Sequence, residues 1–138
     1  MIDFINETDF DFATKQIEEI AKLKTSKQIE FVLTDNDNIK LLNLEFRQKD
    51  EATDVLSFPY EEMPGAPLGT IIVSLDFAKA KAQELGHSIE NEIILLFTHG
   101  LLHILGFDHE IDNGEQRAEE ERILNFFNLP KSLIVRND

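Results

Sequence analysis

The feature that most limits the folds open to this chain is a long apolar stretch, IENEIILLFTHGLLHIL, at residues 89–105. Ser88 precedes it as a helix N-cap, and Glu90 and Glu92 fall in the first turn, where the positive end of the helix dipole favours carboxylates. A helix that is apolar over most of its surface has to be buried. We therefore expect this segment to be the central helix, with the other elements packed around it.

Apolar periodicity predicts the elements that surround this helix. Strands are expected where apolar residues alternate or run together before a turn, and helices where they recur every three to four positions. The predicted strands are 1–5, 28–35, 55–60 and 70–75, and the predicted helices run over 10–24, from Asn36 or Asp37 to about Arg47, from Ser74 to about Leu85, and from Asp112 or Asn113 to about Phe127. The expected fold is one α+β domain, 1–138, with a small mixed β-sheet and about five helices around the central histidine-bearing helix.

Composition narrows the classes of function. The formal net charge is −14, which counts against general binding of nucleic acids, although Lys40, Arg47 and Lys49 can line a local basic path. No apolar run approaches the ~20 residues of a membrane span, and the first residues lack the basic and apolar parts of a signal peptide. There is no cysteine for a disulfide or a thiolate metal site. We expect a cytoplasmic protein without membrane contacts.

Three of the four histidines lie within FTHGLLHILGFDHE, residues 97–110. Positions i and i+4 of a helix share one face, about 6 Å apart along the axis, so His99 and His103 can point at one ion. Gly106 suits the left-handed turn that ends a helix, after which the chain can present His109. Three neutral imidazoles with an open fourth position are typical of a catalytic zinc site. The spacing therefore predicts one metal site, for Zn²⁺, nickel or another divalent metal.

The residue after the first histidine distinguishes two kinds of hydrolase. The spacing H-x-x-x-H-x-x-G-x-x-H matches the zinc signature of the metzincin proteases, which carry a glutamate there as the general base. This chain has Gly100 at that position. Because a glycine inside a helix costs about 1 kcal/mol relative to alanine, a packing or clearance requirement is expected. A buried histidine with a single hydrogen bond is the simpler alternative for each imidazole taken alone.

Polar residues near the histidines, and one arginine far from them, are further candidates. Asp108 is expected to orient a ligand imidazole or to act as a base, whereas Glu110 is expected to be a solvated turn residue. His87, in ELGHS, is expected to belong to a helix connection. Arg47 ends a predicted helix in LNLEFRQKDEATDVLSFP, residues 42–59. Because a guanidinium binds phosphate through two hydrogen bonds, Arg47 is a candidate phosphate ligand.

These segments together resemble the YbeY family of bacterial metal-dependent endoribonucleases. The similarity rests on H-G-L-L-H-I-L-G-F-D-H at 99–109, L-N at 42–43, Arg47, and T-D-V-L-S-F-P at 53–59, and it runs in order from about residue 28 to 129. It implies an α+β fold, a metal ion, usually zinc, held by His99, His103 and His109, and a place for Arg47 in the cleft. The family usually has L-G-D-I where this chain has Leu68, Gly69, Thr70 and Ile71, so no role of that aspartate is transferred.

The resemblance also implies a biological role, and it leaves two alternatives open. The role is cytoplasmic maturation of the 3′ end of 16S rRNA and ribosome quality control, with single-stranded or ribosomal RNA and the small subunit or its assembly proteins as partners. Water activated by the metal would hydrolyse the phosphodiester, and Arg47 would stabilise the developing negative charge. The alternatives are a zinc-dependent protease or other metal hydrolase, and a non-catalytic ribosome-assembly factor.

Overall fold

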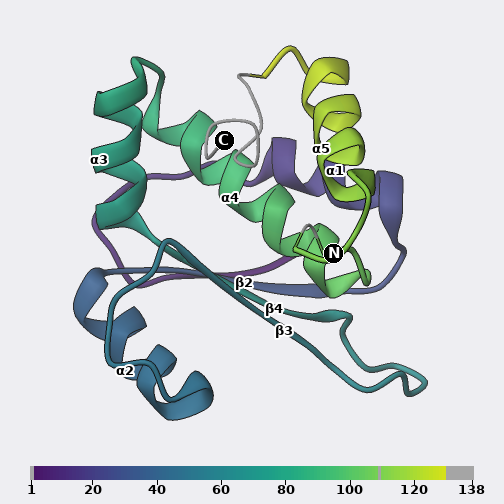
Figure 1. Cartoon of the computed structure of the whole chain (residues 1–138), viewed down its shortest axis with the longest axis horizontal. Coiled ribbons are helices and arrows are strands. Elements are labelled where there is room, and N and C mark those ends of the chain that lie inside the picture. The colour runs from purple at the N-terminus through teal and green to yellow at the C-terminus, as the bar shows by residue number, and fades with distance from the viewer. Residues whose placement is uncertain (1, 109, 130–138) are drawn as a thin grey trace.

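The computed structural model describes residues 2–108 and 110–129, and it is built on a four-stranded sheet (Figure 1). The strands are β1 (Ile2–Asn6), β2 (Ile29–Thr34), β3 (Val55–Pro59) and β4 (Gly69–Ser74), arranged in the order β1-β2-β4-β3. β1, β2 and β4 are parallel, and β3 lies antiparallel to β4. The mixed sheet and the α+β class are as predicted.

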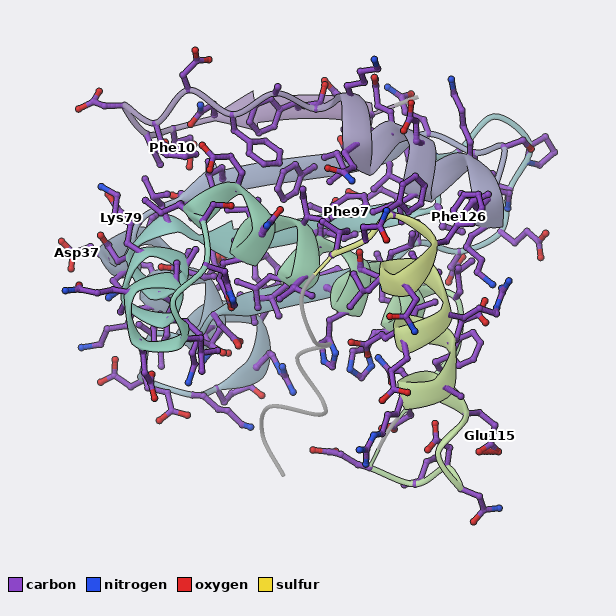
Figure 2. The ribbon with its side chains drawn as sticks, turned by 90° about the horizontal axis from the view of Figure 1, so that it is seen from above. Phe10, Asp37, Lys79, Phe97, Glu115 and Phe126 are labelled. Atoms are coloured by element: carbon purple, nitrogen blue, oxygen red, sulfur yellow. The ribbon has the colours of Figure 1, made fainter. Side chains whose placement is uncertain are left out.

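Helices cover both faces of the sheet. On one face lie α1 (Lys15–Lys24), α3 (Leu75–Leu85), α4 (Ile89–Ile104) and α5 (Glu115–Phe126), and on the other lies α2 (Asn36–Arg47) (Figure 1). α4 contacts β3, β4 and the other three helices of its layer. Phe97, near its middle, is fully buried and lies at the centre of the molecule (Figure 2). The prediction of a central histidine-bearing helix is confirmed.

Each face of the sheet has its own apolar cluster, because side chains alternate along a strand. The main core lies on the α4 side, where Phe31 of β2 contacts Phe97 with ring centroids 5.2 Å apart. A smaller cluster of Ile39, Leu56 and Ile72 joins α2 to the opposite face. α2 is therefore attached to the sheet separately from the main core.

No helix within residues 2–108 and 110–129 combines the length and the apolar character that crossing a membrane requires. α4, the most apolar of them, has 16 residues.

The prediction of a helix over 10–24 is wrong at its N-terminal end, because α1 begins at Lys15. The preceding residues are held in a turn after β1. Asn6 Nδ2 donates to the Phe10 carbonyl (2.7 Å), and the Phe10 N–H donates to Thr8 Oγ1 (3.2 Å). Phe12 then packs edge-on against Phe31, with ring centroids 6.1 Å apart. Tertiary contacts thus override the local periodicity.

Two helix starts also differ from the prediction, while the other ends agree to within one or two residues. Asp35, rather than Asn36 or Asp37, is the N-cap of α2, and its Oδ1 accepts a hydrogen bond from the Asn38 N–H (2.9 Å). α5 begins at Glu115 rather than at Asp112 or Asn113. Asp112 lies before the helix, and its carboxylate accepts a hydrogen bond from the Gln116 N–H in the first turn (2.9 Å). Ser74 and Ser88 cap α3 and α4 as predicted.

The α2 cap gives a direct test of this boundary. Asp35→Ala removes the acceptor for the Asn38 N–H and should lower the free energy of unfolding by about 0.5–2 kcal/mol. Asp37→Ala is the matched control, because Asp37 lies in the first turn and contributes only its attraction to the helix dipole. Urea denaturation of both variants measures the difference, and a larger loss for Asp37→Ala would contradict the assignment.

Candidate active site

Two imidazoles face each other on the last two turns of α4. His99 is 8% exposed and His103 is partly buried. Their Nε2 atoms lie 3.1 Å apart, and their rings are nearly perpendicular, at 77°. The i, i+4 spacing on a regular helix produces this pairing, as predicted from the sequence. The two nitrogens are close enough to share a proton in a hydrogen bond or to contact one ion.

A buried carboxylate on α5 holds the first of these rings. Glu120 is fully buried, and its Oε2 lies 3.1 Å from His99 Nδ1. A carboxylate accepts hydrogen bonds, so it favours a proton on Nδ1 and leaves the Nε2 lone pair of the neutral ring directed at His103. Glu120 Oε1 has no hydrogen-bond partner among residues 2–108 and 110–129. A buried carboxylate with one oxygen left without such a partner would be stabilised by a nearby cation.

Glu120 is a site residue that was not predicted from the sequence. It stands in an acidic run, EEE at 119–121, which is the usual composition of a solvated helix face. The run conceals a regular buried stripe, because Gln116, Glu120, Ile123 and Leu124 are the buried residues of α5. A glutamate in register with Ile123 was therefore the signal that could have found it.

The end of α4 turns the chain back toward the histidines. Gly106 has a φ of 103°, and the Phe107 N–H donates to the Leu102 carbonyl (3.0 Å), which closes the helix. This is the left-handed turn predicted at Gly106. Asp108 follows it, and the Asp108 carbonyl accepts from the Asp112 N–H (3.0 Å), so the segment folds into a further turn. His109, the third predicted ligand, lies outside the described residues.

Gly100 brings α4 close to the sheet beside the first histidine. A Cβ atom at this position would meet Ile71 Cγ2 at 3.0 Å and Val55 Cγ2 at 3.4 Å. The clearance requirement inferred from the sequence is thus a close approach of α4 to β3 and β4. A longer side chain would be driven against these apolar residues of the sheet.

Arg47 approaches from the other layer of the molecule, at the C-terminal end of α2. The helix ends there because Gln48 adopts a left-handed conformation, with a φ of 56°. The buried side chain of Asn43 donates to the Glu51 carbonyl (2.9 Å) and fixes the loop that leads into β3. Asn43, the second residue of the L-N pair, therefore positions this loop.

One cleft of about 610 Å³ unites these segments. Its walls are the end of α2, β3 with the residue before it, the last turns of α4, and the turn that follows α4. The lining residues are Phe46, Arg47, Asp54, Val55, Ser57, Phe58, Pro59, His99, His103, Asp108 and Glu110. Four of the five candidate residues predicted from the sequence therefore line the same cleft, although Arg47 and His103 are 56 positions apart. The fifth, His109, lies outside the described residues.

The remaining sequence candidates have other surroundings. Asp108 Oδ1 accepts a hydrogen bond from the Glu110 N–H (3.0 Å), two residues further along the chain. His87 lies in the α3–α4 connection, as predicted, and its Nε2 contacts the buried Glu92 Oε1 (2.5 Å). Thr70 lies on the same face of the sheet as Ile72, the face that α2 covers, and its hydroxyl donates to Glu30 Oε1 (2.9 Å).

Across residues 2–108 and 110–129, no group of three or more His, Cys, Asp or Glu side chains is arranged to hold a metal ion. The histidine pair therefore supplies two candidate ligands. A third from position 109 stays a prediction.

Comparisons with known proteins identify the family. The family model described as Endoribonuclease YbeY matches residues 3–128, and the chain belongs to this family. A protein described as Endoribonuclease YbeY from Nautilia profundicola is 60% identical over 138 residues, covering 100% of this chain and 99% of the relative. One of the same description from Sulfurimonas denitrificans is 51% identical, with the same coverage.

A solved structure supports the fold. The solution structure of a Thermotoga maritima protein is 27% identical and superposes with a TM-score of 0.60, covering 93% of this chain and 92% of that chain.

Gly100 gives a test that separates this site from that of a protease. Gly100→Glu installs the glutamate of the protease signature, but the carboxylate would be buried against Ile71 and Val55 without a partner. We expect the free energy of unfolding to fall by about 3–5 kcal/mol and casein cleavage to be absent. Circular dichroism with urea, beside a casein assay, measures both.

The matched control is Gly100→Ala. It adds one methyl group against side-chain atoms that can shift, and it should cost at most about 1–3 kcal/mol. A folded Gly100→Glu variant that cleaved casein, and lost this cleavage with His103→Ala, would show a protease-like geometry instead.

Proposed function

We propose that this chain is a metal-dependent endoribonuclease that hydrolyses single-stranded RNA in the maturation of the 3′ end of 16S rRNA. The observation that carries the proposal is the meeting of two mutually facing imidazoles and an arginine in one cleft. Its family supports the choice of substrate, because relatives over the full length are described as endoribonucleases.

The histidine pair fits a metal ion such as Zn²⁺. Two metal–nitrogen bonds of about 2.0–2.1 Å at a tetrahedral angle place the nitrogens about 3.3–3.4 Å apart. His99 Nε2 and His103 Nε2 are 3.1 Å apart, so a small outward movement of the rings would bring both nitrogens to metal-binding distance. Glu120 supports the same role, because a carboxylate on the far nitrogen of a ligand histidine sets its tautomer and orientation. We assign the third ligand to His109; nickel or another divalent metal is compatible with imidazole ligands.

The chain's own residues have distinct tasks in this reaction. A bound divalent metal supplies Lewis acidity toward water and a phosphoryl oxygen. Arg47 makes no ion pair within the described ranges, and its guanidinium can bind two phosphoryl oxygens and stabilise the charge that develops on them. Among the described residues, the Asp108 carboxylate is hydrogen-bonded through Oδ1, to the Glu110 N–H, so Oδ2 can orient or deprotonate the attacking water.

The partners and location follow from the proposed reaction. The substrate is ribosomal RNA, so the protein would act in the cytoplasm on the small ribosomal subunit or together with its assembly proteins. A single-stranded substrate suits an open cleft that has a cation on one wall and a metal site on the other.

The first test is cleavage of a single-stranded oligoribonucleotide by nuclease-free, metal-loaded protein. The double variant His99→Ala/His103→Ala should lose the metal and the cleavage together. Arg47→Ala should lower kcat by about 10²–10³-fold, as for the loss of one donor to a developing anion. Elemental analysis, circular dichroism and the cleavage assay are carried out on the same samples.

The control for Arg47→Ala is Arg122→Ala. Arg122 is an exposed arginine on α5 that pairs with Glu119 and does not line the cleft, so its removal should leave kcat unchanged. A folded, metal-loaded wild type that cuts no RNA would refute the proposal. Unchanged rRNA processing in cells that carry Arg47→Ala would favour the assembly-factor alternative.

The second test concerns the support of His99. Glu120→Gln keeps the size of the side chain but removes its charge, and Glu120→Ala removes the acceptor altogether. We expect metal affinity to fall by about 10–100-fold, more for alanine. Competition with a chromophoric chelator measures it without reference to catalysis. Glu121→Gln is the matched control, since Glu121 is half exposed and pairs with Arg117 on the same helix. Equal affinities for all four proteins would show that Glu120 is only structural.

A further inference from the structure

The described part of the cleft is more negative than positive. It carries one guanidinium, on Arg47, and three carboxylates, on Asp54, Asp108 and Glu110. On α2, Lys40 lies 3.8 Å from the Asp50 carboxylate. In a chain of net charge −14, neutralisation of phosphates supplies little of the affinity for RNA. Contacts other than charge have to hold the strand.

Two aromatic rings line the same cleft. Phe46 precedes Arg47 in the last turn of α2 and is 58% exposed, whereas Phe58 on β3 is partly buried. Their ring centroids are 5.4 Å apart, and the rings are tilted by 56°. A phenylalanine that exposes more than half of its area beside a polar cleft has a large apolar surface without a covering group within the described chain.

The sheet holds this ring pair in place. Phe58 packs against the cluster of Ile39, Leu56 and Ile72 beneath α2, so it forms a fixed support for Phe46. The two neighbours on α2, Phe46 and Arg47, both line the cleft. A strand whose phosphate lies at Arg47 therefore has one of its bases within reach of an aromatic face.

We infer that Phe46, supported by Phe58, is a stacking subsite for a nucleobase next to the phosphate that Arg47 binds. The inference rests on the proposed function, because it takes RNA as the ligand of the cleft. Base–aromatic stacking contributes affinity without reading sequence, since every base has a π-face. It requires an unpaired base, because a base inside a duplex is already covered on both faces. The subsite therefore makes the cleft selective for single strands.

The test is binding of a single-stranded oligoribonucleotide that contains the fluorescent base 2-aminopurine, whose emission is quenched when it stacks. Wild type should quench the probe on binding. Phe46→Leu keeps an apolar side chain but removes the π-face, and it should weaken binding by about 5- to 100-fold with loss of quenching. Phe46→Trp should restore both. In the cleavage assay, Phe46→Leu should raise KM by a similar factor.

Phe126→Leu is the matched control. Phe126 is 70% exposed, has Phe127 as an aromatic neighbour with centroids 5.0 Å apart, and does not line the cleft. It lies at the opposite end of α5 from Glu115 (Figure 2). This substitution should leave binding, quenching and KM unchanged. A probe with an abasic nucleotide at the stacking position should bind wild type and Phe46→Leu equally.

The outcomes separate the inference from the proposed function. RNA cleavage with the same KM and quenching for wild type and Phe46→Leu would overturn the stacking subsite alone. Quenching that depends on Phe46, in a metal-loaded protein that cuts no RNA, would support the subsite and refute the proposed nuclease. Because α2 also exposes Leu41 and Leu44, Phe46→Leu could instead weaken capture of ribosomal subunits without changing oligonucleotide binding. That result would assign the ring to a protein contact and overturn the inference.

Discussion

The seating of α4 on the sheet is the contact on which the rest of the structure depends. Gly100 allows the helix backbone to approach Ile71 and Val55, and twelve of the sixteen residues of α4 are buried. This contact sets where the C-terminal turns of the helix lie relative to β3. Because His99 is the neighbour of Gly100, the same close approach places its imidazole beside β3, the edge strand of the sheet, in the cleft that Arg47 also lines. Packing and chemistry therefore share one constraint.

The local parts of this arrangement were predictable from the sequence, because their causes are local. Ser74 and Ser88 cap the helices that follow them, and four-residue spacing puts His99 and His103 on one face whatever surrounds them. The proximity of Arg47 to this pair was an expectation only through a family resemblance. No periodicity in the chain specifies how α2 meets β3.

Other features could not be predicted because they are decided by partners distant in the chain. The segment before Lys15 has helical periodicity, but Phe12 packs with Phe31 and the helix starts later. Glu120 has the composition of a solvated face, and its contact with His99 depends on how α5 docks on α4. In both cases a tertiary contact stabilises the observed structure more than the local sequence preference stabilises the expected one.

The two walls of the cleft differ in how many of their side chains are buried in the protein. One wall belongs to α4 and the main core, whereas the other belongs to α2, in which only Ile39 and Asn43 are buried. Local opening occurs most readily where few apolar contacts are made. Mild heat or denaturant would therefore unfold α2, which carries Arg47 and Phe46, before it unfolds α4. The imidazole pair and the Glu120 carboxylate would stay folded at that stage. Substrate binding would then be lost at a lower temperature than the metal site.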